Sequence, residues 1–266
     1  MLSGPREWIG KLMLDAPVSV RSLRKVPLLG SVIHGLSHKV VALDQLVWVR
    51  VKSGPAHDLQ IELNPRTGQA YARGEAERMV QNFLARQLQP DDVFYDLGAN
   101  IGLFSLIAAR ITAPRGHVFS FEPDPQNASR LHRNVERNGF SNVTIVESGV
   151  WSSTTARRFA VAPESSPDRG IGSFVIAEPG VSNLLIPCVS LDDFTRSNPL
   201  PTAIKCDVEG AEMEVLKGAR NTLAKSRPWI LCEMHSPEND RGAREFLVGL
   251  GYSLTEIDEM HLFAVP

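Results

Sequence analysis

The fold of this 266-residue chain is decided by residues 93–106, whose sequence is VFYDLGANIGLFSL. The apolar run that ends at Asp96 predicts a buried strand, and the apolar run after Gly102 predicts a helix. Gly98 and Gly102 let the backbone between them approach a ligand closely, and the first turn of the helix offers free N–H groups at the same place. The stretch therefore predicts a strand, turn and helix that form one wall of a ligand site.

The spacing of glycines and acids narrows the class of ligand. Gly98 and Gly102 enclose three residues, none of them glycine, so the turn lacks the G-x-G-x-x-G pattern that holds a dinucleotide pyrophosphate. Glu122 ends a second predicted strand at 117–122, where its carboxylate can accept hydrogen bonds from both hydroxyls of a ribose. A ribose without a diphosphate favours S-adenosylmethionine.

Three motifs in the chain resemble those of the FkbM-type S-adenosylmethionine-dependent methyltransferases. They are DLGANIG at 96–102, FEPDP at 121–125 and KCDVEGAE at 205–212, the last followed by LKGA at 216–219. The likeness runs from about Ala76 to the C-terminus, and the acidic block at 205–212 is its specific part. The resemblance implies a class I methyltransferase (Rossmann-like) α/β fold with helices on both faces of the sheet and an antiparallel last strand. It also implies methyl transfer, most often to a hydroxyl of a natural product, sugar or glycolipid.

Alternating strands and helices beyond residue 75 predict an open α/β sheet on their own. Strands are predicted at 93–97, 117–122, 143–147, 202–207, 228–235, 252–257 and 261–265, with extra strands near 157–162 and 185–190, and helices at 74–88, 101–112, 125–138 and 210–225. Ligands of such sheets bind beyond the carboxyl ends of the strands. Asp96, Glu122, Asp207 and His235 are all expected to emerge at that edge.

We expect two domains, an N-terminal appendage at 1–75 and an S-adenosylmethionine-binding methyltransferase domain at 76–266. In the appendage, helical stretches precede two strands near 46–51 and 59–63, which pair around a turn. The first 40 residues hold six Lys or Arg against two acids, which allows peripheral contact with an anionic membrane. The net charge of -2 offers no general attraction to nucleic acid.

The resemblance also implies a set of cofactor-binding residues. It places Asp96, Gly98, Asn100 and Gly102 at the methionine and ribose, Glu122 at the ribose hydroxyls, and Pro123, Ser148 and Gly149 beside the adenine. Many methyltransferases carry an Asp near this last corner to meet the adenine amine, and here the residues are Glu147 and Ser148. A hydroxyl or a backbone carbonyl would have to replace that carboxylate.

Methyl transfer to oxygen requires an aligned acceptor and a group that removes its proton. Lys205 and Asp207 share a face of one predicted strand, and Glu233 and His235 share a face of the next, so four polar groups converge. Asp207 and His235 are the candidate bases. Lys205 would hold a carboxylate ionised or stabilise an incipient alkoxide.

Other uses of the same residues stay open. Asp207, Glu209, Glu233 and His235 could ligate Mg²⁺ or Mn²⁺, although the nearby ammonium of Lys205 disfavours a metal. Glu209 and Glu212 could instead stabilise the start of a helix, and Glu212 is the weaker functional candidate. N-methylation of a small molecule and a non-catalytic S-adenosylmethionine-binding protein also remain.

The sequence outside these motifs supports fewer predictions. The loop 163–173 contains Arg169, which could hold an acidic or sugar-phosphate acceptor. Cys188, Cys206 and Cys232 lie among apolar neighbours without regular spacing, so we expect reduced packing residues. The sequence contains no apolar run of membrane-spanning length and no secretory signal, and we expect a cytoplasmic enzyme that acts on a small-molecule or glycan hydroxyl.

Overall fold

The computed structural model describes residues 45–160 and 183–266, together with Lys11 and Leu14. The chain forms two compact units, and the division between them falls at Asn82 and Phe83, a few residues after the domain boundary predicted from sequence. The expectations about the basic residues near the N-terminus fall almost entirely outside the described residues, as does the one about Arg169. Among the residues that are described, no helix combines the length and apolar character needed to cross a membrane.

The N-terminal unit contains the predicted pair of strands. β1 (Val47–Arg50) and β2 (Gln60–Leu63) are antiparallel. Alternate residues of both strands are buried, as the alternation in the sequence requires. The short helix α4 (Gln69–Arg73) follows and ends at Gly74 in a left-handed conformation. α5 (Arg78–Gln87) lies within the helix predicted at 74–88.

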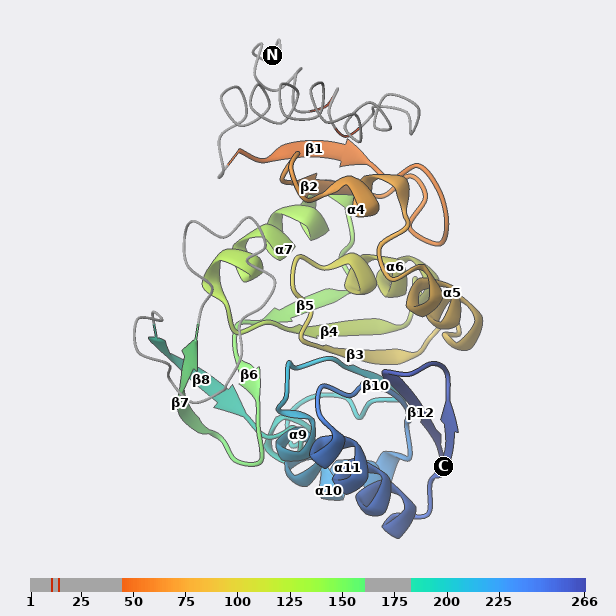
Figure 1. The fold of residues 1–266 in the computed structure, drawn as a ribbon, viewed down its shortest axis with the longest axis vertical. Coiled ribbons are helices and arrows are strands. Elements are labelled where there is room, and N and C mark those ends of the chain that lie inside the picture. The colour runs from red at the N-terminus through yellow and green to blue at the C-terminus, as the bar shows by residue number, and fades with distance from the viewer. Residues whose placement is uncertain (1–10, 12–13, 15–44, 161–182) are drawn as a thin grey trace, which may run out of the picture. The chain divides into compact units, whose positions relative to one another are not determined.

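The second unit is built on a seven-stranded sheet with the order β11-β12-β10-β9-β3-β4-β5 (Figure 1). Its strands are β3 (Val93–Leu97), β4 (His117–Phe121), β5 (Val143–Val146), β9 (Ala203–Cys206), β10 (Trp229–Glu233), β11 (Ser253–Glu256) and β12 (His261–Val265). The five strands from β10 to β5 pair in parallel, whereas β12 is antiparallel to both of its neighbours. The predicted class I methyltransferase sheet with an antiparallel last strand is therefore confirmed.

Helices cover both faces of this sheet, as predicted (Figure 1). α6 (Leu103–Thr112) and α7 (Pro125–Asn138) lie on one face, and α9 (Glu212–Gly218), α10 (Arg220–Ser226) and α11 (Pro237–Gly249) lie on the other. The order of strands reverses between β3 and β9, and connections of the usual right-handed sense on either side of this point put helices on opposite faces of the sheet.

The helices differ from the prediction in two respects. The single helix expected at 210–225 is interrupted at Ala219, next to Gly218, whose α-carbon lies so close to the Trp151 carbonyl that no side chain would fit. The prediction omitted α11, although Ser236 caps it and Pro237 begins it. Its many charged residues obscured the helical period, since few of its side chains are buried.

A separate three-stranded sheet has the order β6-β8-β7. β6 (Gly149–Val150) pairs in parallel with β8 (Asn183–Val189), and β8 is antiparallel to β7 (Thr155–Ala160). β7 and β8 confirm the extra strands predicted near 157–162 and 185–190. A short helix, α8 (Leu191–Phe194), follows β8. All three cysteines are buried and free, as expected.

Gly98 determines how closely β3 and β9 approach one another at the carboxyl edge of the main sheet. Its φ of +79° lies in the left-handed region, and a methyl group on its α-carbon would overlap the backbone carbonyl oxygen of Asp207. Gly139 has a similar φ of +72°, yet a methyl group there would meet nothing within 4 Å. Comparing a substitution at Gly98 with one at Gly139 therefore distinguishes the cost of steric overlap from the cost of the left-handed backbone conformation.

We predict that Gly98→Ala destabilises the protein more than Gly139→Ala does. Gly139→Ala incurs only the left-handed backbone cost, about 1–2 kcal/mol. Gly98→Ala adds overlap with a backbone atom, for which a further cost of about 1–3 kcal/mol or more is expected. Urea unfolding of both variants measures the difference, and equal losses of unfolding free energy would show that Gly98 does not fix this approach.

Candidate active site

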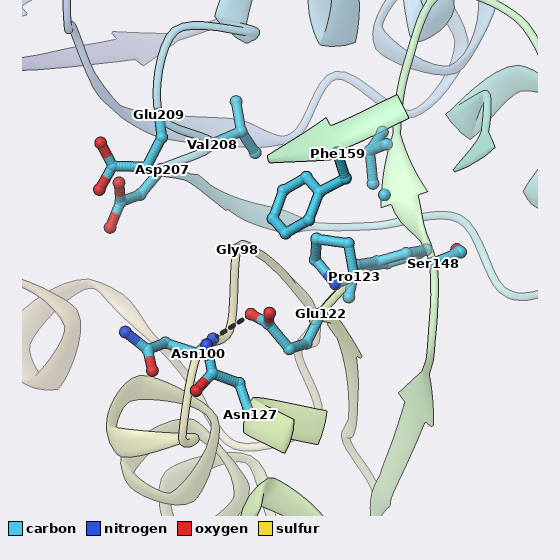
Figure 2. Close-up of a pocket in the computed structure, with 13 residues that line it drawn as sticks. Gly98, Asn100, Glu122, Pro123, Asn127, Ser148, Phe159, Asp207, Val208 and Glu209 are labelled. Atoms are coloured by element: carbon cyan, nitrogen blue, oxygen red, sulfur yellow. Dashed lines mark hydrogen bonds between the residues drawn. The ribbon is translucent and has the colours of Figure 1, made fainter. Parts of the chain in front are cut away.

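A pocket opens at the carboxyl ends of β3, β4 and β9 (Figure 2). The space inside it, part of which is open to solvent, amounts to about 580 Å³. Its lining consists of Gly98, Asn100, Phe121, Glu122, Pro123, Asn127, Ser148, Gly149, Val150, Phe159, Asp207, Val208 and Glu209. The main sheet, the β3–α6 turn and the three-stranded sheet all contribute to it.

Glu122 is the fixed point of the pocket. Its carboxylate is almost fully buried and accepts hydrogen bonds from the backbone N–H of Asn100, at 2.7 Å, and of Asp124, at 2.9 Å. Burial raises the pKa of this carboxyl to about 7. The side chain of Asn127 also hydrogen-bonds to this carboxylate. The acceptor capacity that remains on its two oxygens is available to ligand hydroxyls.

The β3–α6 turn is held by backbone hydrogen bonds. The N–H groups of Gly98 and Ala99 both donate to the carbonyl of Phe121, at 3.0 and 2.9 Å. Gly102 begins α6 with a φ of +94° and lies against Leu131, outside the pocket lining. The turn is thus fixed to the end of β4 along its length.

Asp96 lies behind the pocket and not in it. It is fully buried and accepts a hydrogen bond from Ser105 Oγ at 2.6 Å, and Ser120 Oγ in turn donates to Ser105 Oγ. Burial raises the pKa of this carboxyl, and the field of Lys205 opposes that rise. Of the eight predicted cofactor residues, six line the pocket, while Asp96 and Gly102 shape it from behind. Their roles toward a cofactor stay predictions.

Phe159 belongs to the pocket and escaped the sequence analysis. It comes from β7, and its ring and that of Pro123 project into the same part of the pocket (Figure 2). Nothing in the sequence of β7 separates Phe159 from an ordinary buried strand residue. Asn127, in the first turn of α7, was missed for a similar reason, because it follows the FEPDP motif without belonging to it.

A buried cation supports the predicted acid at the end of β9. Lys205 Nζ lies 3.0 Å from Asp207 Oδ2 and over the ring of Phe104. The lysine side chain is only 3% exposed and is held against Asp207, and its predicted part in catalysis stays a prediction. Because β3 and β9 pair with Asp96 opposite Lys205, the same cation lies near both acids.

His235 is surrounded by carboxylates. Its Nδ1 lies 2.7 Å from Glu212 Oε1, and its Nε2 faces Glu209 at 3.4 Å and both Asp207 and Glu233 at 3.7 Å. The hydrogen bond to Glu212 is the main cause that raises the pKa of His235 to about 9. The imidazole is therefore protonated at neutral pH, which favours Asp207 over His235 as the base.

The same donors could hold a divalent cation. One ligand atom each from Asp207, Glu233 and His235 lies within 4.8 Å of the other two. The ammonium of Lys205, in contact with Asp207, opposes a second cation there. The sequence-based view that a metal is not favoured stays a prediction.

A second cleft begins on the other side of His235. It encloses about 830 Å³, including space open to solvent, between the first part of α11 and the β11–β12 turn. Its lining comprises Met234, His235, Ser236, Pro237, Asp240, Arg244, Glu256, Asp258, Glu259, Met260, His261 and Leu262. The two hollows share no lining residue, but His235, which lines the second, has its Nε2 facing Asp207 and Glu209, which line the first, so this histidine lies between them.

The sheet order and the pocket at its carboxyl edge define a class I methyltransferase. Residues 96–263 match the family model described as the methyltransferase FkbM domain, and the chain belongs to this family of S-adenosylmethionine-dependent methyltransferases. The chain is 32% identical over 191 residues to the hexuronic acid methyltransferase AglP of Haloferax volcanii, which covers 71% of this chain and 74% of that protein.

Two further proteins are similar over part of their length. The AMB antimetabolite synthetase AmbE of Pseudomonas aeruginosa is 32% identical over 215 residues, covering 67% of this chain but only 10% of that protein. The crystal structure of an FkbM methyltransferase from Methylobacillus flagellatus shares the fold with a TM-score of 0.51 at 21% identity, over 67% of this chain and 44% of that one.

We predict that the affinity for S-adenosylhomocysteine rises about tenfold between pH 6 and pH 8, because the ionised Glu122 carboxylate accepts the ribose hydroxyls and its pKa is about 7. Glu122→Gln should bind more weakly, and its affinity should not change over this range. Calorimetric titration at several pH values measures both. The exposed Glu147→Gln is the matched control and should behave as wild type. A pH-independent wild-type affinity would remove Glu122 from the ribose site.

Proposed function

We propose that this enzyme methylates a hydroxyl group of a sugar or of a natural product. The observation that supports it best is the position of the acid–histidine cluster, Asp207, Glu209, Glu233 and His235, between two hollows. The first has the features of a cofactor pocket, and the second, polar cleft has room for an acceptor. The name of the relative from Haloferax volcanii, a hexuronic acid methyltransferase, is consistent with a sugar acceptor.

The pocket residues fit S-adenosylmethionine. Glu122 can accept hydrogen bonds from the ribose hydroxyls. Gly98 has no side chain, and a larger residue there would overlap the backbone of Asp207 at the edge of the pocket. Ser148 Oγ is buried and has no hydrogen-bond partner among the described residues, so it is available to the adenine amine in place of the usual Asp. Pro123 and Phe159 would pack against the adenine ring. When bound, the cofactor supplies the electrophilic methyl group.

The protein's own part in the reaction is to orient the acceptor and take its proton. Asp207 lines the cofactor pocket and faces His235, so an acceptor hydroxyl between the two hollows would donate its hydrogen bond to this carboxylate. Lys205, buried beneath Asp207, forms an ion pair with the carboxylate and holds it in place. The protonated His235 balances the charge of the acids around it.

A base of this kind favours O-methylation over the alternatives. An alcohol is a weak nucleophile that must lose its proton during transfer, whereas a neutral amine attacks through its free lone pair. A buried cation that maintains a carboxylate beside the cofactor pocket is costly and suits the first case better. Two alternatives remain, N-methylation and cofactor binding without turnover. The experiment below distinguishes both of them from O-methylation.

The charge of the second cleft bears on the acceptor. Four acids line it, Asp240, Glu256, Asp258 and Glu259. The groups that oppose them are Arg244, which pairs with two of these acids, and the imidazoles of His235 and His261, whose pKa values are both raised. Because the acids outnumber these cations, we infer that the cleft favours a neutral or amino-bearing sugar or polyol over a uronate. The acceptor would then differ in charge from the one in the relative's name.

We predict that Asp207→Asn lowers the rate of methyl transfer about 10²–10⁴-fold, the usual contribution of a general base. Release of S-adenosylhomocysteine is measured with matched neutral, amino and uronic acid glycosides, and NMR of the product locates the methyl group. Asp91→Asn is the control, because Asp91 forms an exposed ion pair with Arg115 away from the pocket. A methylated nitrogen, or full activity of Asp207→Asn, would contradict the proposal.

We also predict that activity survives treatment with EDTA and does not rise with added Mg²⁺, because Lys205 already supplies the positive charge at Asp207. Activity that is lost on chelation and restored by Mg²⁺ or Mn²⁺ would instead make Asp207, Glu233 and His235 metal ligands.

A further inference from the structure

Glu212 is a further carboxylate in contact with His235, and the proposed reaction gives it no direct part. It is the first residue of α9, and its side chain is fully buried. It lines neither of the two hollows. A buried carboxylate without partners would be strongly unfavourable, so its contacts determine what it does.

Each oxygen of Glu212 accepts hydrogen bonds from a different segment of the chain. Oε1 accepts from the backbone N–H of Gly210 at 2.8 Å and lies 2.7 Å from His235 Nδ1. Oε2 accepts from the side-chain amide of Asn239, in the first turn of α11, at 2.6 Å. Asn239 also donates to the Gly210 carbonyl at 2.8 Å, which closes the network.

These contacts fix both the rotation and the protonation pattern of the imidazole. Every other partner of the Glu212 carboxylate is an N–H donor, so the carboxylate is an acceptor and His235 Nδ1 must carry a proton. Nε2 is then the nitrogen directed at the reaction site. The charged groups that face it are Asp207 and Glu209 from the segment after β9, and Glu233 from β10, which is in turn 3.4 Å from His261 of β12.

We propose that Glu212 is a positioning residue of the active site, which holds His235 with Nδ1 as donor so that Nε2 faces Asp207 and Glu209 between the two hollows. This inference rests on the proposed function, because it gives Glu212 a role through His235 and Asp207. A buried acid that orients a histidine by its far nitrogen is a known means of fixing an imidazole for proton chemistry.

The alternative is that Glu212 only supports the fold. It joins α9, α11 and the end of β10, and loss of such a link would lower stability without a specific effect on His235. The test therefore needs a readout of the imidazole itself. Glu212→Gln keeps the size of the side chain and one acceptor oxygen but removes the charge. Glu214→Gln, two residues further along α9, is the matched control, since Glu214 contacts Ser152 and Lys217 instead.

The experiment combines NMR of the ¹⁵N-labelled histidine rings with steady-state kinetics on an accepted glycoside. The His235 signals are assigned by their loss in His235→Gln. In wild type and Glu214→Gln, Nδ1 should have the shift of a protonated nitrogen throughout the titration. In Glu212→Gln this signature should change, kcat should fall roughly tenfold or more, and KM and the affinity for S-adenosylhomocysteine should stay close to wild type.

Two results would overturn the proposal. One is an unchanged His235 signature in folded Glu212→Gln, and the other is a changed signature with unchanged kcat. If Glu212→Gln does not fold, Asn239→Ser is used instead, because it removes one hydrogen-bond donor to Glu212 at a half-exposed position. The His235 signals and kcat are measured as before, and we expect smaller changes in both. Failure of this proposal can be distinguished from failure of the proposed function. In the second case the wild-type protein itself would transfer no methyl group to a hydroxyl.

Discussion

The hydrogen bonds between the Glu122 carboxylate and the backbone hold the site together. They join the turn after β3 to the end of β4, at the point where Gly98 also lets that turn reach the carbonyl of Asp207, the residue after β9. Three neighbouring strands therefore end at fixed positions relative to one another. The pocket proposed for the cofactor is the space that these ends leave, and Asp207 is at its border because β9 pairs directly with β3.

The second constraint is electrostatic. Lys205 is buried at the level of Asp96 and Asp207, and His235 is enclosed by four carboxylates, so the positive charges of the site are inside and the acids surround the openings. This arrangement places a buried cation in contact with the Asp207 carboxylate at the edge of the pocket. It also leaves the second cleft acidic, which connects the chemistry of the base to the charge of the acceptor.

The sequence predicted the fold closely because local patterns and long-range order agree here. Strand and helix periods alternate, and the glycine turn, the ribose acid and the acidic motif each lie directly after a strand, where the topology brings them to one edge. The structure revealed contacts between residues that are distant in the sequence. Phe159 enters the pocket from β7, and no local pattern marks it. Glu212 looked like a helix-start residue, and only the position of α11 and β10 shows that it contacts His235.

We propose that S-adenosylmethionine binds with its ribose at Glu122 and its methyl donor toward Asp207. A crystal structure with S-adenosylhomocysteine tests this most directly. We expect both ribose hydroxyls to donate to Glu122, the adenine to lie between Pro123 and Phe159 within reach of Ser148 Oγ, and the sulfur to face Asp207 and the second cleft. A cofactor whose ribose lies away from Glu122, or whose sulfur is separated from Asp207 by the protein, would contradict the account.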